Sequence, residues 1–299
     1  MPNTTIRAFE PSDEPEFLET QRVAFRGLEY LPRVKVGLLA LDHEGSFVAE
    51  RDGSVIGCVG LFKLERPGWF EVRNLAVKDL HPEKLAVDLL AKTSDYLDSK
   101  RPEFVKASTP AVQPYVDLYK RTGFVPARRS VRIRWDLSTC KISESKVETR
   151  NLLKEHANDA AEVWVEGLRP HWDYWIEEQG GPDELKAWVK QSVGKDTGWI
   201  GAFFENKLVG VAILRADSYG KGEARFNGAY ALPDYRQQGI GTALMNASIR
   251  EARQFLQDRM RVYTLAYLDH LAPGAILYLK SGGLIEAEYL QLEKKGNKS

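Results

Sequence analysis

The sequence predicts two mixed α/β domains in tandem, and three observations support this fold class. The 299 residues are enough for about two domains of ordinary size. A polar segment at residues 138–146 lies near the middle of the chain, after an alternating apolar and charged run at 131–135. Features on either side of this segment recur in the same order, which indicates an internal repeat. We therefore expect one domain over residues 1–140 and a second over 146–299, each an α/β fold of the α+β type with a mixed sheet.

The composition excludes several classes of protein. The chain has 42 Lys and Arg residues against 42 Asp and Glu residues. A polyanion or an anionic membrane surface attracts proteins with an excess of basic residues. Because this chain has no such excess, we expect no nucleic-acid and no membrane partner. Cys58 and Cys140 are too few for a disulfide framework, and the five histidines lack metal-ligand spacing. The first residues lack the apolar core of a signal peptide. We expect a cytoplasmic protein without a bound metal.

The elements of the first half can be placed in order. A helical stretch follows Arg7, and residues 47–59 form two apolar runs on either side of Asp52 and Gly53. Asp-Gly between apolar runs is a strong signal of a two-residue hairpin turn. A strand, an amphipathic helix, a closing helical segment and a final strand are expected at 72–77, 82–99, 118–124 and 131–135.

The second half repeats this order. Its first helix, two hairpin strands, next strand, long helix and closing segment are expected at 157–164, 200–204, 208–213, 224–231, 240–257 and 277–283. Gly57 and Gly210 hold the same place in the two hairpins. Tyr119 and Tyr278 are 159 residues apart, and the glycine that follows each tyrosine has the same offset. This agreement favours two copies of one fold.

The most informative segment lies between a predicted strand and a predicted helix, at residues 232–244. Arg236, Gly239 and Gly241 follow the spacing Arg-x-x-Gly-x-Gly. Glycine at such a turn allows a positive φ and a close approach of the backbone to a ligand. The free amides and the positive dipole end of the helix favour an anion. A dinucleotide fingerprint would need a third glycine where Leu244 stands. The loop therefore predicts a phosphate or pyrophosphate site.

With these residues, 147–290 resembles a domain of the Gcn5-related N-acetyltransferase (GNAT) family. The acyl-CoA motif of the family, Gln/Arg-x-x-Gly-x-Gly/Ala, is matched at Arg236, Gly239 and Gly241. Its closing motif, Leu-Tyr-x-x-x-Gly-Phe, is matched by Leu277, Tyr278 and Gly282, with Gly283 where the aromatic residue usually stands. Residues 4–137 resemble a second, degenerate copy, so the chain resembles a tandem GNAT protein.

The first copy departs from the family pattern at the cofactor loop. An ungapped alignment of the two halves places Pro82, Leu85 and Val87 at the three motif positions. Leu and the β-branched Val disfavour a positive φ and would block the backbone's approach to a ligand, and Pro82 lacks an amide donor. The closing segment at 118–124 matches the family fully. We expect this copy to keep its fold and to lack the CoA pyrophosphate loop.

The resemblance implies an acetyl-CoA-dependent N-acetyltransferase that transfers an acyl group to the amine of a small molecule by direct attack. Acetyl-CoA would be the co-substrate, with its pyrophosphate on the loop amides near Arg236 and its pantetheine along the preceding strand. The residues expected to contact acetyl-CoA are Ala229, Tyr230, Ala231, Leu232, Arg236, Gln238, Gly239, Ile240, Gly241 and Thr242.

The resemblance also implies the catalytic groups. The family's tyrosine at the position of Tyr278 points at the cofactor sulfur, and a tyrosine with an ordinary pKa of about 10 is protonated at neutral pH. Tyr278 is therefore the expected general acid, and a strand-end amide such as that of Tyr230 is expected to stabilise the oxyanion. Glu223, at the start of the strand before the loop, is the candidate general base. Asp217, Tyr219, Asp269 and a chain of water molecules are the alternatives.

The acceptor side is indicated by aromatic residues. Trp172, Tyr174 and Trp175 are expected to line the acceptor site, where an aromatic wall suits a cationic or aromatic amine. Packing of these rings between the two halves is the alternative. Two other functions stay open: a non-catalytic acyl-CoA-binding sensor or partner protein, and an acetyltransferase for protein N-termini or lysines. A homodimer also stays open.

Overall fold

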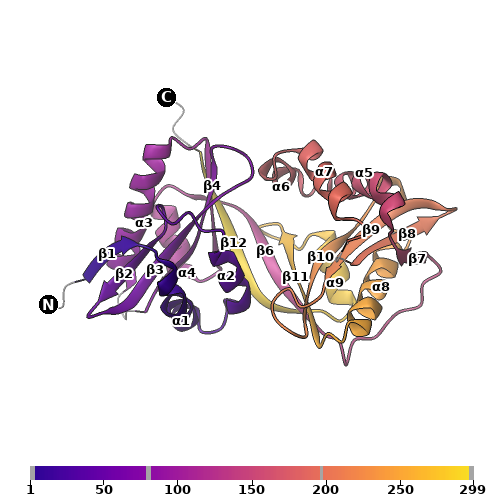
Figure 1. Cartoon of the computed structure of the whole chain (residues 1–299), viewed down its shortest axis with the longest axis horizontal. Helices are drawn as coiled ribbons and strands as arrows, with labels where there is room; N and C mark the ends of the chain where they lie inside the picture. The colour runs from indigo at the N-terminus through magenta and orange to yellow at the C-terminus, as the bar shows by residue number, and fades with distance from the viewer. Residues whose placement is uncertain (1–3, 79–81, 196–197, 296–299) are drawn as a thin grey trace. The chain divides into compact units, whose positions relative to one another are not determined.

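The computed structural model of the chain describes residues 4–78, 82–195 and 198–295. These residues divide into two compact units, which are described separately (Figure 1). The N-terminal unit comprises Met1–Arg129 together with Ala287–Ser299, and the C-terminal unit comprises Ser130–Glu286. Each unit is a mixed α/β fold built on one sheet, which confirms the predicted fold class.

The N-terminal unit contains a sheet with the strand order β1-β2-β3-β4-β5-β12. Its strands are β1 (Thr4–Ala8), β2 (Phe47–Arg51), β3 (Ser54–Lys63), β4 (Trp69–Val77), β5 (Phe104–Pro110) and the greater part of β12 (Leu284–Lys295). Its helices are α1 (Glu14–Phe25), α2 (Leu31–Leu38), α3 (Pro82–Lys100) and α4 (Gln113–Arg121). All neighbouring strands whose register is described here are antiparallel except β4 and β5, which run parallel.

The predicted hairpin is present in both copies. Arg51 pairs with Ser54 across a two-residue turn in which Asp52 and Gly53 have φ values of 50° and 77°. Two residues with positive φ give the turn whose twist matches that of paired strands. In the second copy Glu205 and Asn206 form the same turn, with φ values of 48° and 64°.

The C-terminal unit contains a sheet with the strand order β6-β11-β10-β9-β8-β7. Its strands are β6 (Val125–Asp136, from Ser130 onward), β7 (Glu148–Asn151), β8 (Gly198–Phe204), β9 (Lys207–Arg215), β10 (Glu223–Ala231) and β11 (Arg259–Ala266). Its helices are α5 (Ala157–Leu168), α6 (Asp173–Glu178), α7 (Pro182–Ser192), α8 (Ile240–Gln254) and α9 (Pro273–Lys280). In the described part of both units, short 3₁₀ turns lie at Pro11–Asp13, Lys154–His156 and Pro233–Tyr235.

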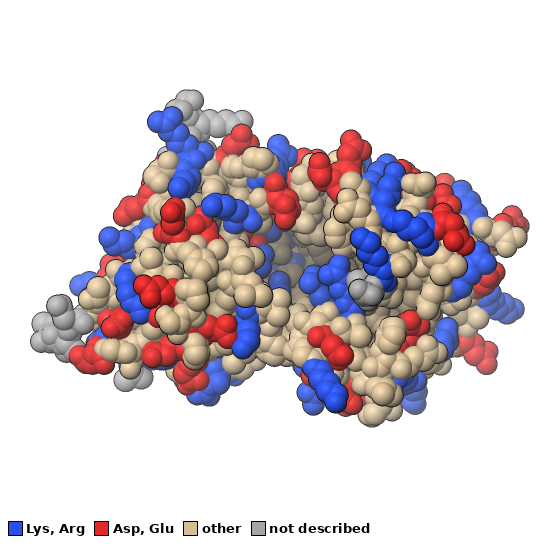
Figure 2. Space-filling model, viewed as in Figure 1, with Lys and Arg blue, Asp and Glu red and all other residues tan. Residues whose placement is uncertain are grey.

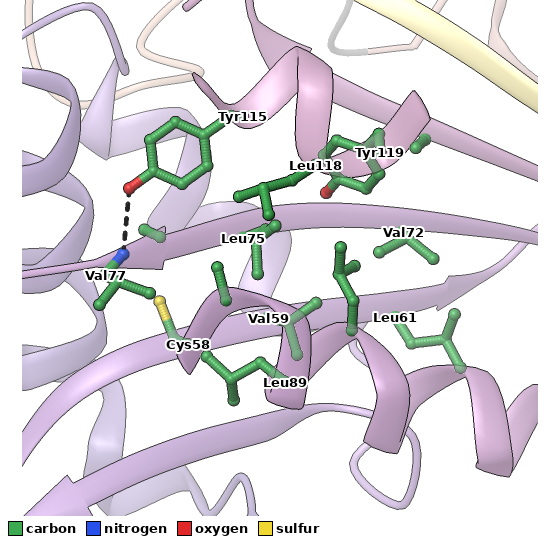
Figure 3. Packing of buried hydrophobic residues seen from close by; sticks show 14 of the residues in the cluster. Cys58, Val59, Leu61, Val72, Leu75, Val77, Leu89, Tyr115, Leu118 and Tyr119 are labelled. Carbon is green, nitrogen blue, oxygen red and sulfur yellow. Dashed lines mark hydrogen bonds between the residues drawn. The ribbon is translucent and has the colours of Figure 1, made fainter. Parts of the chain in front are cut away.

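The sheet of the C-terminal unit is buried on both faces. Ile200 packs with residues of α8 and α9, whereas its neighbour Trp199 packs with residues of α5, α6 and α7. Successive residues of a strand point to opposite faces, so α8 and α9 cover one face and α5 to α7 cover the other. The N-terminal unit has its own core, in which side chains of β3 and β4 meet those of α3 and α4 (Figure 3).

The two units are not bounded where the sequence placed the domains. The run at 131–135, expected to close the first domain, lies in β6 within the C-terminal unit, and residues 287–295 of β12 pair with β5 of the N-terminal unit. Each unit thus contains strand residues from the other half of the sequence. Alternating apolar and polar residues predict a strand, but they do not specify which sheet it joins.

Charged side chains of both signs are interspersed on the face shown in Figure 2. In the part of the chain that the structure describes, no helix is both long enough and apolar enough to cross a bilayer. Within the same residues, no group of three or more His, Cys, Asp or Glu side chains could hold a metal ion.

Candidate active site

The strands β10 and β11 separate at the centre of the C-terminal unit. They pair in parallel only over Glu223–Arg225 and Arg259–Arg261, although both strands continue well beyond these residues. Between Phe226 and Ala229, β10 also shifts its register against β9, and Gly228 has a φ of 107°. This bulge adds a residue to β10 and changes its course, a feature common beside active sites. The result is a gap between two parallel strands with backbone groups of β10 along one side.

The direction of the β10 amides decides which of them face this gap. The amide of Leu232 donates to the carbonyl oxygen of Val209 on β9 at 3.0 Å. Because successive amides alternate along a strand, the amide of Tyr230 also points toward β9, and those of Ala229 and Ala231 point toward the gap. The expected oxyanion donor, Tyr230, is therefore on the wrong side of the strand. The amides that face the gap belong to its two neighbours.

Tyr278 reaches this gap from α9. Its hydroxyl oxygen accepts a 3.0 Å hydrogen bond from the amide of Ala229. The ring is held edge-on by Trp135 and Phe226, at centroid distances of 5.8 and 5.6 Å, and the residue is 2% exposed. Burial raises the pKa of Tyr278 to about 12, although the Ala229 amide opposes this shift. Tyr278 is therefore both a core aromatic residue and a protonated hydroxyl at the bulge.

The predicted anion loop begins α8. Gly239 precedes the helix with a φ of 83°, and a Cβ at this position would meet no atom within 4 Å. Ala243 makes the first helical bond, to the carbonyl of Gly239. No described residue accepts a hydrogen bond from the amides of Ile240, Gly241 or Thr242. Three free amides at an open helix N-terminus suit a phosphate or pyrophosphate group.

Arg236 is held by backbone carbonyls. Its guanidinium donates to the carbonyl oxygens of Ala231 at 3.3 Å, Gly167 at 3.2 Å and Arg169 at 2.6 Å. These bonds connect the loop to the end of β10 and to the C-terminal end of α5. The arginine therefore fixes the position of the loop, a role that the motif spacing alone did not indicate. The side chain of Gln238 likewise donates within the loop, to the carbonyl of Asp234 at 3.0 Å.

The structure does not bring Glu223 to Tyr278, so the proposed base is misplaced. Glu223 is six residues before Ala229 on β10, roughly 20 Å along an extended strand. Its carboxylate pairs closely with Arg261 and, at 3.3 Å, with Arg259. A carboxylate between two arginines at the far end of the strand is poorly suited to take a proton from an amine at the bulge.

The alternative bases lie in turns or loops away from the bulge or are already paired with other residues. Asp217 belongs to the turn between β9 and β10, where it accepts hydrogen bonds from Gln257 and from the amide of Gly222. Its hydrogen bond from Gln257 lowers the pKa of the Asp217 carboxyl. Tyr219 lies in the same turn. Asp269 is exposed and pairs with His270 at 2.6 Å, in the loop after β11.

The aromatic residues lie over the face covered by α5 to α7. Trp172 stacks on Tyr174 with a centroid distance of 6.0 Å and meets Trp175 edge-on at 6.4 Å. All three rings are half-buried, and both tryptophans pack against the core of the C-terminal unit. Their contacts within this unit leave part of each ring open to solvent, so they fit a lining for the acceptor as well as a packing role.

His171 is a residue that the sequence did not single out. Its Nδ1 is in close hydrogen-bond contact with the hydroxyl of Tyr267, which directly follows β11. The two residues are 96 positions apart, and neither belongs to a motif with fixed spacing. The sequence therefore contains no pattern from which this contact could have been predicted.

The N-terminal copy has a matching bulge. In β4 the register shifts opposite Cys58 and Gly60, and Asn74 has a φ of 60°. The amide of Val77 donates to the hydroxyl of Tyr115 at 3.2 Å (Figure 3). Tyr119, the counterpart of Tyr278, is fully buried, and its hydroxyl has no partner among the described residues.

The start of α3 bears on the expected loss of the anion loop in this copy. This helix begins at Pro82, so Leu85, at the position of Gly239, is already inside the helix and packs on the core. Leu85 is not among the residues with a positive φ, whereas Gly239 is. Residues 79–81, just before the helix, lie outside the described residues.

Comparison with known proteins gives a consistent picture. Residues 160–278 match the family model described as "Acetyltransferase (GNAT) family". No curated protein gave a significant match. Over 98% of its length the chain is similar to a GCN5-related N-acetyltransferase from Sphaerobacter thermophilus, with a TM-score of 0.78, 15% identity and 95% of that chain covered.

Two further solved structures are similar over nearly the whole chain. One is a tandem GNAT protein from the clavulanic acid biosynthesis pathway (TM-score 0.68, 13% identity, 99% of this chain and 100% of that chain). The other is the GCN5-related glucosamine N-acetyltransferase region of a fungal multi-domain GH3 beta-N-acetylglucosaminidase (TM-score 0.72, 12% identity, 98% of this chain and 38% of that chain). At these identities the similarity shows the fold, which is that of a tandem GNAT protein.

Proposed function

We propose that the C-terminal unit of this chain, which has a tandem GNAT fold and matches the family model over residues 160–278, transfers an acetyl group from acetyl-CoA to the amine of a small molecule. The observation that carries this proposal is the position of the Tyr278 hydroxyl, 3.0 Å from the Ala229 amide at the gap between β10 and β11. The free amides at the start of α8 lie in the same unit and fit the pyrophosphate of CoA.

Each part of the site has a distinct task. Bound acetyl-CoA would supply the thioester whose carbonyl carbon the amine attacks. The amides of Ile240, Gly241 and Thr242 would hold the pyrophosphate. The amide of Ala229 holds the Tyr278 hydroxyl, and the gap-facing amide of Ala231 would hold the pantetheine or stabilise the developing oxyanion. When the carbon–sulfur bond breaks, Tyr278 would donate its proton to the leaving thiolate and the attacking nitrogen would lose its extra proton to solvent, so that free CoA thiol and an amide are formed.

Burial keeps the proposed acid in its protonated form. The raised pKa of Tyr278, about 12, keeps the hydroxyl protonated throughout the neutral range. Because the thiolate of CoA is a weaker base than a tyrosinate with this pKa, donation of the proton is uphill, and solvent must then return a proton to the tyrosinate. The amide of Ala229 orients the hydroxyl oxygen and leaves its proton free to point into the gap.

The test is release of free thiol from acetyl-CoA in the presence of an amine panel: tryptamine, histamine, glucosamine, spermidine and a lysine-containing peptide. We expect one or more small amines to accelerate release above the hydrolysis rate, and Tyr278→Phe to abolish most of that acceleration. A preference for the peptide would favour an acetyltransferase that acts on proteins.

The second candidate is an acyl-CoA-binding sensor, and one observation favours it. Glu223, the carboxylate expected to be the general base, is paired with two arginines at the distant end of β10. A sensor would show thermal stabilisation by acetyl-CoA together with no thiol release on any member of the panel.

A further inference from the structure

The contact between His171 and Tyr267 lies at the gap between β10 and β11. The strands pair at Arg225 and Arg261, and from there five more residues of β11 reach Ala266 while six residues of β10, one of them in the bulge, reach Ala231. At about 3.3 Å per residue both paths advance roughly 17 Å, so Tyr267 follows β11 at the level of Ala231 and Leu232. The gap therefore has β10 on one side and Tyr267 on the other.

His171 approaches this position from the loop between α5 and α6. Its Nδ1 is in close contact with the Tyr267 hydroxyl, and the rings meet at 6.1 Å between centroids. The loop itself is fixed, because Arg236 donates to the carbonyl of Arg169 at 2.6 Å. This loop joins α5 to α6, two helices that cover the face of the sheet opposite to the one from which α9 presents Tyr278. Acid and base on opposite faces of the gap would flank a thioester held between them.

The charges around His171 favour its neutral form. Partial burial lowers the pKa of the imidazole, and the positive charge of Arg236 lowers it further, while Asp173 on α6 opposes both. On the β11 side the ring faces the Tyr267 hydroxyl, and beyond it His270 and Asp269 form their own pair at 2.6 Å. A neutral imidazole at pH 7 has a lone pair that can accept a proton.

We propose that His171, positioned by Tyr267, is the general base that deprotonates the acceptor ammonium group. The proposal rests on the proposed function and supplies the base that Glu223 does not. With Nδ1–H donating to the Tyr267 oxygen, the lone pair of Nε2 takes one proton from R–NH₃⁺, which gives imidazolium and the neutral amine R–NH₂. No described residue contacts Nε2 by a hydrogen bond, and the side chain is partly open to solvent. The amine then attacks the thioester, and the imidazolium releases its proton to water.

The test compares His171→Gln, His171→Ala and the matched control His270→Gln in the full chain, with the amine of the panel that gives the fastest thiol release. We expect His171→Gln to lower kcat about 100-fold at pH 7 with little change in KM for acetyl-CoA. The acid limb of the pH–rate profile, expected below pH 6.5 in the unaltered chain, should disappear. Imidazole added to His171→Ala should restore part of the rate, which a purely structural histidine would not allow. His270→Gln should keep both the rate and the limb.

The outcomes separate the two proposals. If the unaltered chain releases thiol and His171→Gln keeps its rate and its acid limb, the base assignment is wrong and the proposed function stands. If His171→Gln loses rate but imidazole rescues nothing in His171→Ala, the histidine is structural and the base assignment is again wrong. If the unaltered chain releases no thiol with any amine, the proposed function fails and the base assignment falls with it.

Discussion

The backbone amide of Ala229 donates a 3.0 Å hydrogen bond to the hydroxyl oxygen of Tyr278, across the gap between β10 and β11. This bond connects α9, which covers one face of the sheet, to β10 at its bulge. In the N-terminal copy the amide of Val77 donates to the hydroxyl of Tyr115. The hydroxyl of Tyr119 has no described partner there. The copies share a fold, but only one places the tyrosine of the closing motif at the strand.

The first prediction follows from this difference. Tyr278→Phe keeps the ring packing with Trp135 and Phe226 and removes the proton donor, so kcat should fall about 100-fold or more while affinity for acetyl-CoA changes little. Tyr119→Phe is the matched control, because its hydroxyl has no described partner, and it should leave kcat unchanged. Steady-state thiol release and equilibrium binding measure both effects. Equal losses of rate in the two variants would contradict the assignment.

Tyr278 also predicts a dependence of stability on pH. Its pKa is raised from about 10 in the unfolded chain to about 12 in the fold, so the folded protein binds this proton more tightly. The stabilisation is complete below pH 10 and is lost as the pH rises through 12. Thermal unfolding between pH 9 and 12 should therefore show a steeper loss of stability for the unaltered chain than for Tyr278→Phe. Parallel curves would show that the hydroxyl does not titrate in this range.

The anion loop gives a second pair of matched substitutions. Gly239 and Gly53 have φ values of 83° and 77°, and at both positions a Cβ would meet no atom within 4 Å. Alanine at either position should therefore cost a similar amount of stability, roughly 1–2 kcal/mol for a left-handed residue. Only Gly239→Ala should weaken acetyl-CoA binding, by about tenfold, since its methyl group enters the open space at the N-terminus of α8. Calorimetric titration with CoA measures the difference; an equal effect on binding would place the pyrophosphate elsewhere.

How much the sequence could predict depends on whether a feature is local. Sequence analysis correctly places two hairpin turns and one helix cap. Their positions have a positive φ, and the residues there are Asp52–Gly53, Glu205–Asn206 and Gly239. Arg236 was assigned to the phosphates because the motif contains it, yet its partners are three carbonyls, two of them nearly 70 residues away in sequence. Glu223 was chosen from its place in the strand, and the arginines that pair with it come from β11. Long-range pairings of this kind have no periodic signature.

The fourth prediction concerns Glu223 itself. Glu223→Gln should keep kcat within about twofold, because the carboxylate is paired with Arg259 and Arg261 far from Tyr278. The substitution should instead lower the free energy of unfolding, because the buried Arg261 would lose a carboxylate partner. Arg259→Gln, which removes the exposed partner, should cost less than about 1 kcal/mol. A large loss of kcat in Glu223→Gln with unchanged CoA affinity would restore Glu223 as the base.

The last prediction concerns Glu286 on β12, which lies among arginines of β6 and β11. Its carboxylate pairs with Arg134 at 2.7 Å, Arg261 at 2.9 Å and Arg132 at 3.0 Å, and the side chains of Arg132 and Arg261 are 4% and 6% exposed. Glu286→Gln removes the carboxylate that these buried guanidinium groups share, so we expect a cost of about 3–5 kcal/mol at pH 7.

The matched control for Glu286 is Glu288, two residues along the same strand, whose pair with Arg129 at 3.2 Å is partly exposed and should be worth less than about 1 kcal/mol. Burial alone would raise the pKa of Glu286, but the hydrogen bond and charge of Arg261, with Arg132, outweigh it and hold the pKa below its ordinary value. The stabilisation is therefore present above about pH 4.3 and is lost as the pH falls further, through the lowered pKa. Chemical unfolding of the unaltered chain and Glu286→Gln at pH 7 and at pH 3 should show a difference that shrinks on acidification. A gap that stays constant with pH would mean that the cost arises from packing rather than from charge.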